Sequence, residues 1–290
     1  MVAVATERLS SRPRVAPHPL RLRRIVLYLG LIVICLLWLA PLGSQIITAF
    51  KSQAESYATQ AWQLPSRPTL ENFDRAWTKI EPQFVNTFII TIPSTLLSVG
   101  IGALAAYSIS RLRFVGSELL YLAIVGSYVI PFGSIVPTLV TMLDQLGLYD
   151  TFAGIILTHT AHGQMIMVFI LARFFKSIPD EVVDAARVDG CSALGVLWNI
   201  ILPLSTPALA AGVILQFAWI WNDFFKALII VPTTASAPVT VALQGFTGQY
   251  ATEIGYRSAA SLIAALPSLF VFVVFQRYFI RGITSGALKG

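Results

Sequence analysis

The segment from Ile25 to Phe50 contains no charged residue and is the first long apolar stretch of the chain. About 20 residues at 1.5 Å per residue already cross a hydrocarbon layer about 30 Å thick, so this segment is long enough to span a membrane. A cleavable signal sequence has a shorter apolar core of about 7–15 residues. We therefore expect an uncleaved membrane-spanning helix near the N-terminus.

Composition agrees with a membrane protein. Hydrophobic residues make up 56% of the chain and charged residues 12%, and the mean hydropathy is +0.74, which leaves too little polar surface for a water-soluble fold. Further apolar segments are bounded by charges, prolines or glycines. The sequence predicts an all-α polytopic protein with six transmembrane helices, the other five at about Phe84–Ile109, Leu119–Leu143, Phe152–Ala172, Thr206–Ile229 and Ser258–Phe275.

The positive charges predict the orientation. Of the 20 Lys and Arg residues, 14 fall on one side of the predicted spans and five on the other, with Lys226 inside the fifth span. Positive charge is concentrated in cytoplasmic segments, so both termini are expected in the cytoplasm. The expected cytoplasmic residues are Arg8, Arg12, Arg14, Arg21, Arg23, Arg24, Arg111, Arg113, Arg173, Lys176, Arg187, Arg277, Arg281 and Lys289; the external ones are Lys51, Arg67, Arg75, Lys79 and Arg257.

This topology also explains the net charge of +6, so we expect no nucleic-acid partner. The two cysteines, Cys35 and Cys191, are too distant along the predicted spans to suggest a disulfide or a metal framework. We divide the chain into a basic tail (1–24), a transmembrane domain (25–281) and a C-terminal tail (282–290). The external segment Lys51–Gln83 is too polar to span a membrane.

The loop between the fourth and fifth spans, about residues 177–203, has helix signals of its own, and we call it the knuckle. Ser177 is a candidate N-cap with Pro179 in the first turn. Asp180 and Glu181 suit the positive end of a helix dipole. Gly190 is suited to the left-handed conformation that ends a helix, and Ser192 is placed to cap a second one.

The second helix of the knuckle is predicted to place Leu194, Leu197, Trp198 and Ile201 on one face and to stop at Pro203. The pair Ala185-Ala186 leaves a low surface that another protein could approach closely. From these patterns alone, a docking element and an ordinary interfacial loop are equally good readings.

The spacing of Asp184-Ala185-Ala186, Gly190, Ile200 and Leu202-Pro203 resembles the EAA loop of ABC importer permeases. The chain departs from that motif at Asp184, where the family usually has Glu. Further segments resemble the MalG-like branch of carbohydrate importer permeases. These are Asn86-Thr87-Phe88, the run from Ala105 to Phe114, Trp221-Asn222-Asp223 and the end from Gly282 to Gly290.

The resemblance implies an ATP-driven importer of sugars or sugar-like solutes in a prokaryotic inner membrane. It implies three partners: a second permease subunit, a cytoplasmic ATPase dimer that binds ATP and Mg, and an extracytoplasmic solute-binding protein. This chain would bind no cofactor itself. The residues carried over to the ATPase contact are Asp184, Ala185, Ala186, Asp189, Gly190, Leu202 and Pro203, with Gly286, Ala287, Lys289 and Gly290 of the tail.

Polar residues in the fourth span mark a candidate substrate path. Side chains such as His159, His162 and Gln164 normally face protein or water when they lie at membrane depth. The two histidines are three residues apart, as in some metal sites, but no third ligand is evident. Contacts between helices and contacts with a sugar both remain open for these residues, and we expect no metal.

The fifth span brings Trp219, Trp221, Asn222, Asp223 and Lys226 together. Asp223 and Lys226 are spaced to pair on one helix face. Tryptophan rings stack on sugars, yet they also anchor helices at the membrane interface, and we favour the anchor. Trp221, Asn222 and Asp223 therefore enter as substrate-path candidates beside a structural alternative.

Two other function classes fit the sequence less well. A secondary carrier needs a coupling-ion site, and Lys226 is placed to neutralise Asp223, the candidate carboxylate. A membrane enzyme would need a motif such as Gly-x-Ser-x-Gly or His-Glu-x-x-His, and neither occurs. Gly282, Gly286 and Lys289 do not form a phosphate loop, because no Ser or Thr follows the lysine.

Overall fold

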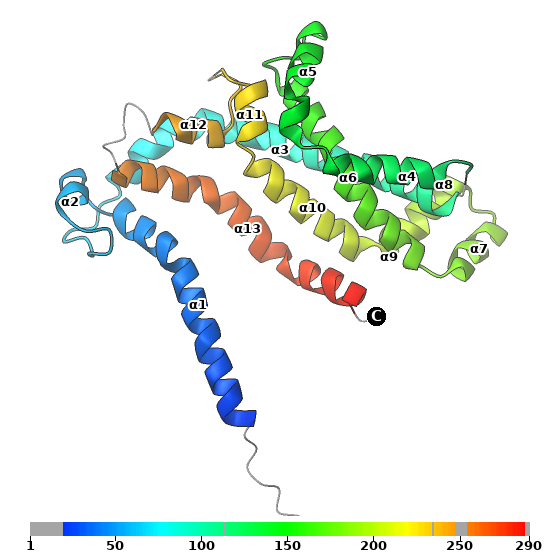
Figure 1. Cartoon of the computed structure of the whole chain (residues 1–290), viewed down its shortest axis with the longest axis horizontal. Coiled ribbons are helices and arrows are strands. Elements are labelled where there is room, and N and C mark those ends of the chain that lie inside the picture. The colour runs from blue at the N-terminus through cyan, green and yellow to red at the C-terminus, as the bar shows by residue number, and fades with distance from the viewer. Residues whose placement is uncertain (1–19, 113, 234, 247–253, 288–290) are drawn as a thin grey trace, which may run out of the picture.

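The computed structural model describes residues 20–112, 114–233, 235–246 and 254–287, and within these ranges the regular structure is helical, with no β-strand (Figure 1). The long helices are α1 (Leu20–Ala49), α3 (Glu71–Arg111), α6 (Phe152–Ser177) and α13 (Ile254–Ala287). The shorter elements are α2 (Gln53–Ala58), α4 (Ser117–Gly126), the 3-10 turn η1 (Ser127–Val129), α5 (Phe132–Gln145), α7 (Asp180–Val188), α8 (Ala193–Val196), the π-helical segment η2 (Leu197–Ile201), α9 (Leu202–Leu204), α10 (Thr206–Trp221), α11 (Phe225–Ile230) and α12 (Val239–Gly245).

Six membrane crossings are compatible with these helices. Four described helices are long and apolar enough to cross alone: Arg23–Ala49, Glu71–Arg111, Phe152–Ser177 and Ile254–Gln276. Two bent pairs could supply one crossing each: Ser117–Val129 with Phe132–Gln145, and Ala193–Leu204 with Thr206–Trp221. The all-α, polytopic prediction is therefore confirmed, although two of the crossings are not straight helices.

The third predicted span, Leu119–Leu143, is wrong as a single helix. The chain bends by 103° between the α4–η1 unit and α5. Pro131 lies at the bend in an extended conformation, and Ile130 before it is extended as well. Proline lacks the N–H that a continuous helix needs and disfavours helical geometry in the preceding residue, so the helix stops there.

The fifth predicted span, Thr206–Ile229, is also interrupted. Helix α10 ends at Trp221 after 16 residues, which gives a length of about 24 Å. Asn222 to Phe224 lie between α10 and α11. Broken helices of this kind are tolerated at membrane depth where they are buried in protein or line a cavity.

The second span begins earlier than predicted. Helix α3 starts at Glu71 rather than near Phe84, so part of the polar segment Lys51–Gln83 is helical. Ala76 and Ile80 are fully buried against α13 residues such as Ala259 and Ala260. The polar start of α3 is therefore stabilised by a narrow row of buried apolar residues. A search for long apolar runs does not detect such a row.

Helix α3 packs against α6, α10 and α13. Met167 of α6 is fully buried between two glycines, Gly102 on α3 and Gly212 on α10. A Cβ at Gly102 would lie 2.6 Å from Cβ of Met167, so the helices approach closely at this point. Small residues that allow such approach are typical of helix contacts in membranes.

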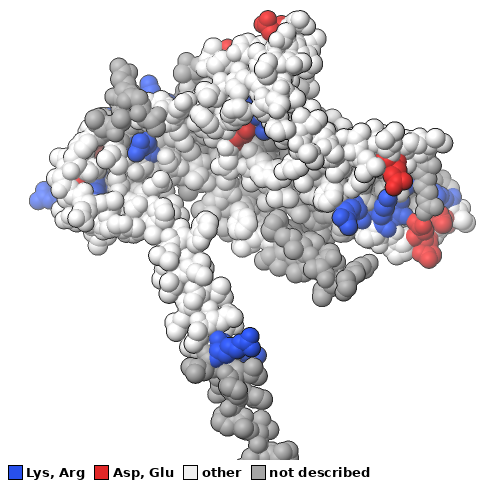
Figure 2. Space-filling view, viewed as in Figure 1, with Lys and Arg blue, Asp and Glu red and all other residues white. Residues whose placement is uncertain are grey.

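Helix α1 diverges from the rest of the molecule along most of its length (Figure 1). Its side chains from Ile25 to Leu39 are exposed within the chain, and they are almost all apolar. Figure 2 shows charged side chains gathered mainly at the two ends of the body, with a largely uncharged surface between them. This is the charge distribution expected of a protein whose middle is surrounded by lipid.

Candidate functional site

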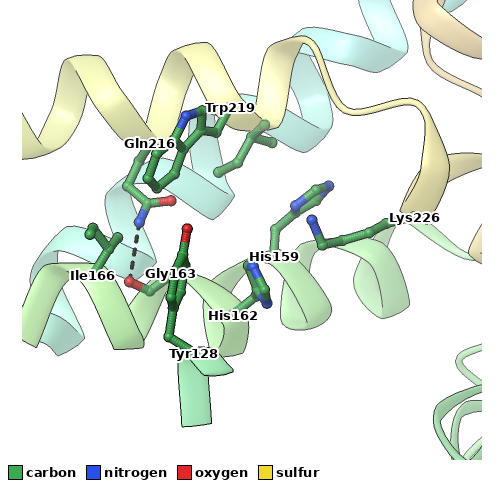
Figure 3. Close-up of a pocket in the computed structure, with 9 residues that line it drawn as sticks. Tyr128, His159, His162, Gly163, Ile166, Gln216, Trp219 and Lys226 are labelled. Atoms are coloured by element: carbon green, nitrogen blue, oxygen red, sulfur yellow. Dashed lines mark hydrogen bonds between the residues drawn. The ribbon is translucent and has the colours of Figure 1, made fainter. Parts of the chain in front are cut away.

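A small cavity with several polar side chains in its wall lies where α6, α10, α11 and η1 meet (Figure 3). Its volume is about 30 Å³. This is room for a water molecule or two, and most of the lining side chains are hydrogen-bonding groups or aromatic rings. The lining residues are Tyr128, His159, His162, Gly163, Ile166, Gln216, Trp219, Ile220 and Lys226.

Asp223 and Lys226 form the ion pair that the sequence predicts, with Nζ 3.3 Å from Oδ1. The other carboxylate oxygen, Oδ2, accepts a hydrogen bond at 3.1 Å from the backbone N–H of Ala227, in the first turn of α11. The ammonium group of Lys226 also lies 5.1 Å from the centre of the Phe132 ring. Each charge has partners that reduce the cost of burying it.

The two histidines of α6 both reach the cavity. His159 is 5% exposed, and its Nε2 lies 3.9 Å from Oδ2 of Asp223. His162 is less buried, and its ring is nearly perpendicular to the Phe132 ring, with 6.0 Å between the ring centroids. Across the described ranges, no group of three or more His, Cys, Asp or Glu side chains is arranged to hold a metal ion.

Gln164 does not line this cavity. Its Nε2 donates to the carbonyl of Thr160 at 3.0 Å and to that of Ser98 on α3 at 3.4 Å. The side chain therefore lies in the contact between α3 and α6. This placement favours the helix-contact alternative for Gln164.

Trp221 and Asn222 also lie away from the cavity. The Trp221 side chain is 1% exposed, and its Nε1 donates to the carbonyl of Ala264 on α13 at 2.9 Å. Asn222 donates to Ser268 of α13 at 3.2 Å. The expectation that Trp221 anchors the helix at the membrane interface is wrong. Its ring lies inside the protein and connects α10 to α13.

Gln216 and Tyr128 line the cavity but were not selected from the sequence. Nε2 of Gln216 donates to the carbonyl of Gly163 at 3.1 Å, across the contact between α10 and α6 (Figure 3). Gln216 is buried and is the one amide in the apolar run of α10. A lone amide in a membrane-spanning segment was the signal that could have identified it.

The Asn86-Thr87 pair of α3 connects to the loop before α12. Nδ2 of Asn86 donates to the carbonyls of Ala235 and Ala237 at 2.9 and 3.0 Å. Oγ1 of Thr87 accepts from the backbone N–H of Val239 at 2.8 Å. One residue later, Oγ1 of Thr240 donates to the carbonyl of Asp223 at 2.7 Å, so this loop is held beside the break in the fifth span.

The knuckle consists of α7, a turn and the α8–η2–α9 segment. Gly190 has φ +87°, the left-handed conformation that the sequence predicts. Oγ of Ser192 accepts a hydrogen bond from the N–H of Gly195 at 3.2 Å and caps α8, also as predicted. The turn therefore has the expected chemistry at both of its ends.

Two helix boundaries in the knuckle differ from the prediction. Ser177 ends α6 and donates to the carbonyl of Phe174 at 2.7 Å, so it does not cap α7. Helix α7 begins at Asp180 because Ile178 and Pro179 are extended. Pro203 lies inside α9, and the bend falls at Ser205 instead.

The apolar side chains of the second knuckle helix do not share one face. Leu197 and Ile201 are buried, whereas Leu194 and Trp198 are exposed. Leu197 begins a π-helical segment, and the wider turn changes the 3.6-residue register on which the prediction rested.

The knuckle residues carried over from the resemblance divide between two surfaces. Asp184, Ala185, Asp189, Gly190 and Pro203 are exposed. Ala186 is buried with Val183 against the body of the protein, and Leu202 packs against the same cluster. Ala186 therefore does not contribute to a low exposed surface. In the C-terminal tail, Gly286 and Ala287 end α13, and Lys289 and Gly290 lie outside the described residues.

Most of the chain is similar in sequence to known transport proteins. Residues 98–285 match the family model of the binding-protein-dependent transport system inner membrane component. The melibiose/raffinose/stachyose import permease protein MelC of Bacillus subtilis is 34% identical over 271 residues, covering 92% of this chain and 97% of the relative. The trehalose/maltose transport system permease protein MalG of Thermococcus litoralis is 32% identical over 275 residues, covering 93% and 98%.

Other relatives extend the comparison. The osmoprotective compounds uptake permease protein GgtD of Synechocystis sp. is 30% identical over 276 residues, covering 92% of this chain and 93% of the relative. A chain of a bacterial ABC transporter involved in the import of the acidic polysaccharide alginate has a similar fold. Its TM-score is 0.78 at 24% identity, over 91% of this chain and 99% of that one.

Proposed function

This chain belongs to the family of binding-protein-dependent transport system inner membrane components, and we propose that it is one of the two pore-forming permease subunits of an ATP-driven carbohydrate importer. The names of two relatives that cover nearly the whole chain support a sugar as solute: one imports melibiose, raffinose and stachyose, and the other transports trehalose and maltose. The observation that carries the proposal is this similarity over more than nine tenths of the chain; the cavity between α6 and α10, at about 30 Å³, is too small for a sugar in this conformation and marks only where a path could open.

The side chains around that cavity suit a carbohydrate path that widens when the helices move. Gln216 and Tyr128 offer hydrogen-bonding groups, and the ring of Trp219 offers a flat apolar face. Asp223 and Lys226 pair with each other, so neither charge is left for a coupling ion. These features support an uncharged sugar moved by a conformational change, and they argue against a secondary carrier.

The knuckle and both termini face the cytoplasm in this proposal, as the distribution of Lys and Arg indicates. The exposed residues Asp184, Ala185 and Gly190 contact the ATPase dimer, which binds ATP and Mg. Gly286, Ala287, Lys289 and Gly290 extend the same contact. The solute-binding protein docks on the opposite side of the membrane, and the second permease subunit and lipid together cover the apolar surface of α1.

Reconstitution tests this proposal. The two permease subunits and the ATPase would be placed in vesicles, with ATP inside and the binding protein outside. We expect ATP hydrolysis to rise several-fold when the binding protein carries melibiose, raffinose, trehalose or maltose. Hydrolysis that stays unchanged with every one of these sugars, while an unrelated solute stimulates it, would contradict the carbohydrate assignment.

A further inference from the structure

The end of α3 contacts both helices of the knuckle, although α3 is not joined to the knuckle in sequence. Helices α7 and α8 lie together at one end of the molecule (Figure 1). Two side chains of α3 reach them, Tyr107 and Arg111. They are four residues apart and so share one face of the helix.

Arg111 joins three parts of the chain. Its side chain is 6% exposed, and its guanidinium group donates to the backbone carbonyls of Phe175 and Ile178 and forms an ion pair with Asp180. The two carbonyls belong to the last turn and C-cap of α6, where a positive charge is favourable. Asp180 is the first residue of α7. One arginine of α3 therefore links the end of α6 to the start of α7.

Tyr107 holds the other half of the knuckle. It is nearly fully buried, and its hydroxyl donates to the carbonyl of Ala193, the first residue of α8, at 2.8 Å. Between the two polar contacts, small and apolar side chains form one buried cluster. The cluster includes Ala103 and Ala106 of α3, Val183 and Ala186 of α7, Val196 of α8 and Leu197 of η2.

Neither end of the knuckle continues into its neighbouring membrane helix as one straight helix. Ile178 and Pro179 separate α6 from α7 in an extended conformation. On the other side, the segment Ala193–Leu204 meets α10 at a bend of 78°. An extended linker and a sharp bend do not by themselves fix the orientation of the knuckle relative to the membrane helices. The contacts with α3 join the knuckle to the membrane domain independently of these two connections.

We propose that Tyr107 and Arg111 are positioning residues of this transporter: they fix the orientation of the knuckle on α3, so that movement of a docked ATPase reaches the membrane-spanning helices through α3. The proposal rests on the function proposed above, in which the knuckle receives the ATPase. It assigns no contact with sugar or nucleotide to either residue. Loss of either contact leaves the knuckle present but able to tilt.

Two matched pairs of variants test the proposal in the complete reconstituted complex. Tyr107→Phe removes only the hydroxyl, and Ser108→Ala is its control, because Ser108 bonds within its own helix to Leu104. Arg111→Lys keeps the charge but cannot reach all three acceptors. Its control is Arg173→Lys, an exposed arginine near the same end of α6 that lies over the ring of Phe169.

The measured quantity is sugar taken up per ATP hydrolysed. We expect a fall of about fivefold for Tyr107→Phe, the usual effect of one hydrogen bond. For Arg111→Lys we expect about tenfold or more, because charge-assisted bonds are stronger. Basal ATP hydrolysis should persist, and both controls should match the unchanged complex. Unchanged coupling in both Tyr107→Phe and Arg111→Lys, with normal coupling in the unchanged complex, would overturn the proposal and leave the proposed function intact.

A distance measurement covers the case in which a variant fails to assemble. Spin labels on cysteines at Leu104 of α3 and Val188 of α7, in a chain with Cys35→Ser and Cys191→Ala, report on the seating of the knuckle. Val188 is 88% exposed and Leu104 is also exposed, so both accept labels. We expect one narrow distance distribution that is the same with and without ATP. A shift on ATP binding would overturn the proposal, because the knuckle would then move on α3.

Discussion

Nζ of Lys226 lies 3.3 Å from Oδ1 of Asp223 beside the cavity between α6 and α10, and both side chains are largely buried. The carboxylate also accepts a hydrogen bond from the N–H of Ala227 in the first turn of α11. Removal of one partner of a buried pair leaves the other charge without compensation. The pair is therefore expected to behave as one unit.

A double-mutant cycle tests that expectation. Lys226→Met and Asp223→Asn should each lower the free energy of unfolding by about 3 kcal/mol. The double variant should cost less than the sum of the two, since no unpaired charge remains. Thermal unfolding of the purified complex in detergent measures all three, with the exposed Lys79→Met as control. Strict additivity would show that the two groups do not interact.

Gln216 offers a test of the cavity. We expect Gln216→Leu to raise the KM for the transported sugar about fivefold, because an amide that contacts the solute or holds the carbonyl of Gly163 is lost. Gln276→Leu is the control, since Gln276 is exposed and donates to the carbonyl of Val273 within its own helix, away from the cavity. An unchanged KM with normal protein levels would exclude Gln216 from the sugar path.

The close contact at Met167 predicts that alanine substitutions at two nearby glycines of α3 differ sharply in their effect on stability. Gly102→Ala should destabilise the protein by about 1–3 kcal/mol, because the new methyl group would lie 2.6 Å from Cβ of Met167, which cannot rotate away. Gly100→Ala, on the same helix, meets nothing within 4 Å and should be neutral or slightly stabilising. Unfolding midpoints of the two variants give the comparison. Equal midpoints would mean that α3 and α6 are not in close contact there.

Several of the sequence predictions that depend on neighbouring residues along the chain are confirmed. Gly190 and Ser192 behave as their turn and cap signals require, and the spacing of Asp223 and Lys226 predicts their ion pair. The errors arise where distant segments decide the conformation. Trp221 is buried by α13, and the apolar pattern of the knuckle is divided by a π-helical turn.

The candidate site was only partly visible in the sequence for the same reason. His159 and His162 stand out as polar groups in an apolar run, but Gln164, next to them, faces α3 instead of the cavity. Tyr128 lies in the 3-10 turn just before the bend at Pro131, and it lines the cavity from there. A one-dimensional pattern contains neither the bend nor the neighbour across the helix contact.

Gly190 allows the strain of the knuckle turn to be separated from its role in coupling. A Cβ in the left-handed conformation costs about 1–2 kcal/mol, and a branched side chain costs more. We expect Gly190→Val to reduce sugar-stimulated ATP hydrolysis while the protein remains in the membrane. Gly116→Ala and Gly190→Ala make a matched pair, because Gly116 has nearly the same φ, +88°, and equally open space but lies outside the knuckle. If the pair lose coupling equally, the effect is strain alone.

Sugar uptake into vesicles that contain the assembled transporter tests the central claim most directly. With ATP and Mg inside and sugar-loaded binding protein outside, we predict uptake that continues when ionophores abolish every ion gradient and stops when ATP is replaced by a non-hydrolysable analogue. Uptake that ignores the analogue and follows an ion gradient instead would contradict the account and identify a secondary carrier.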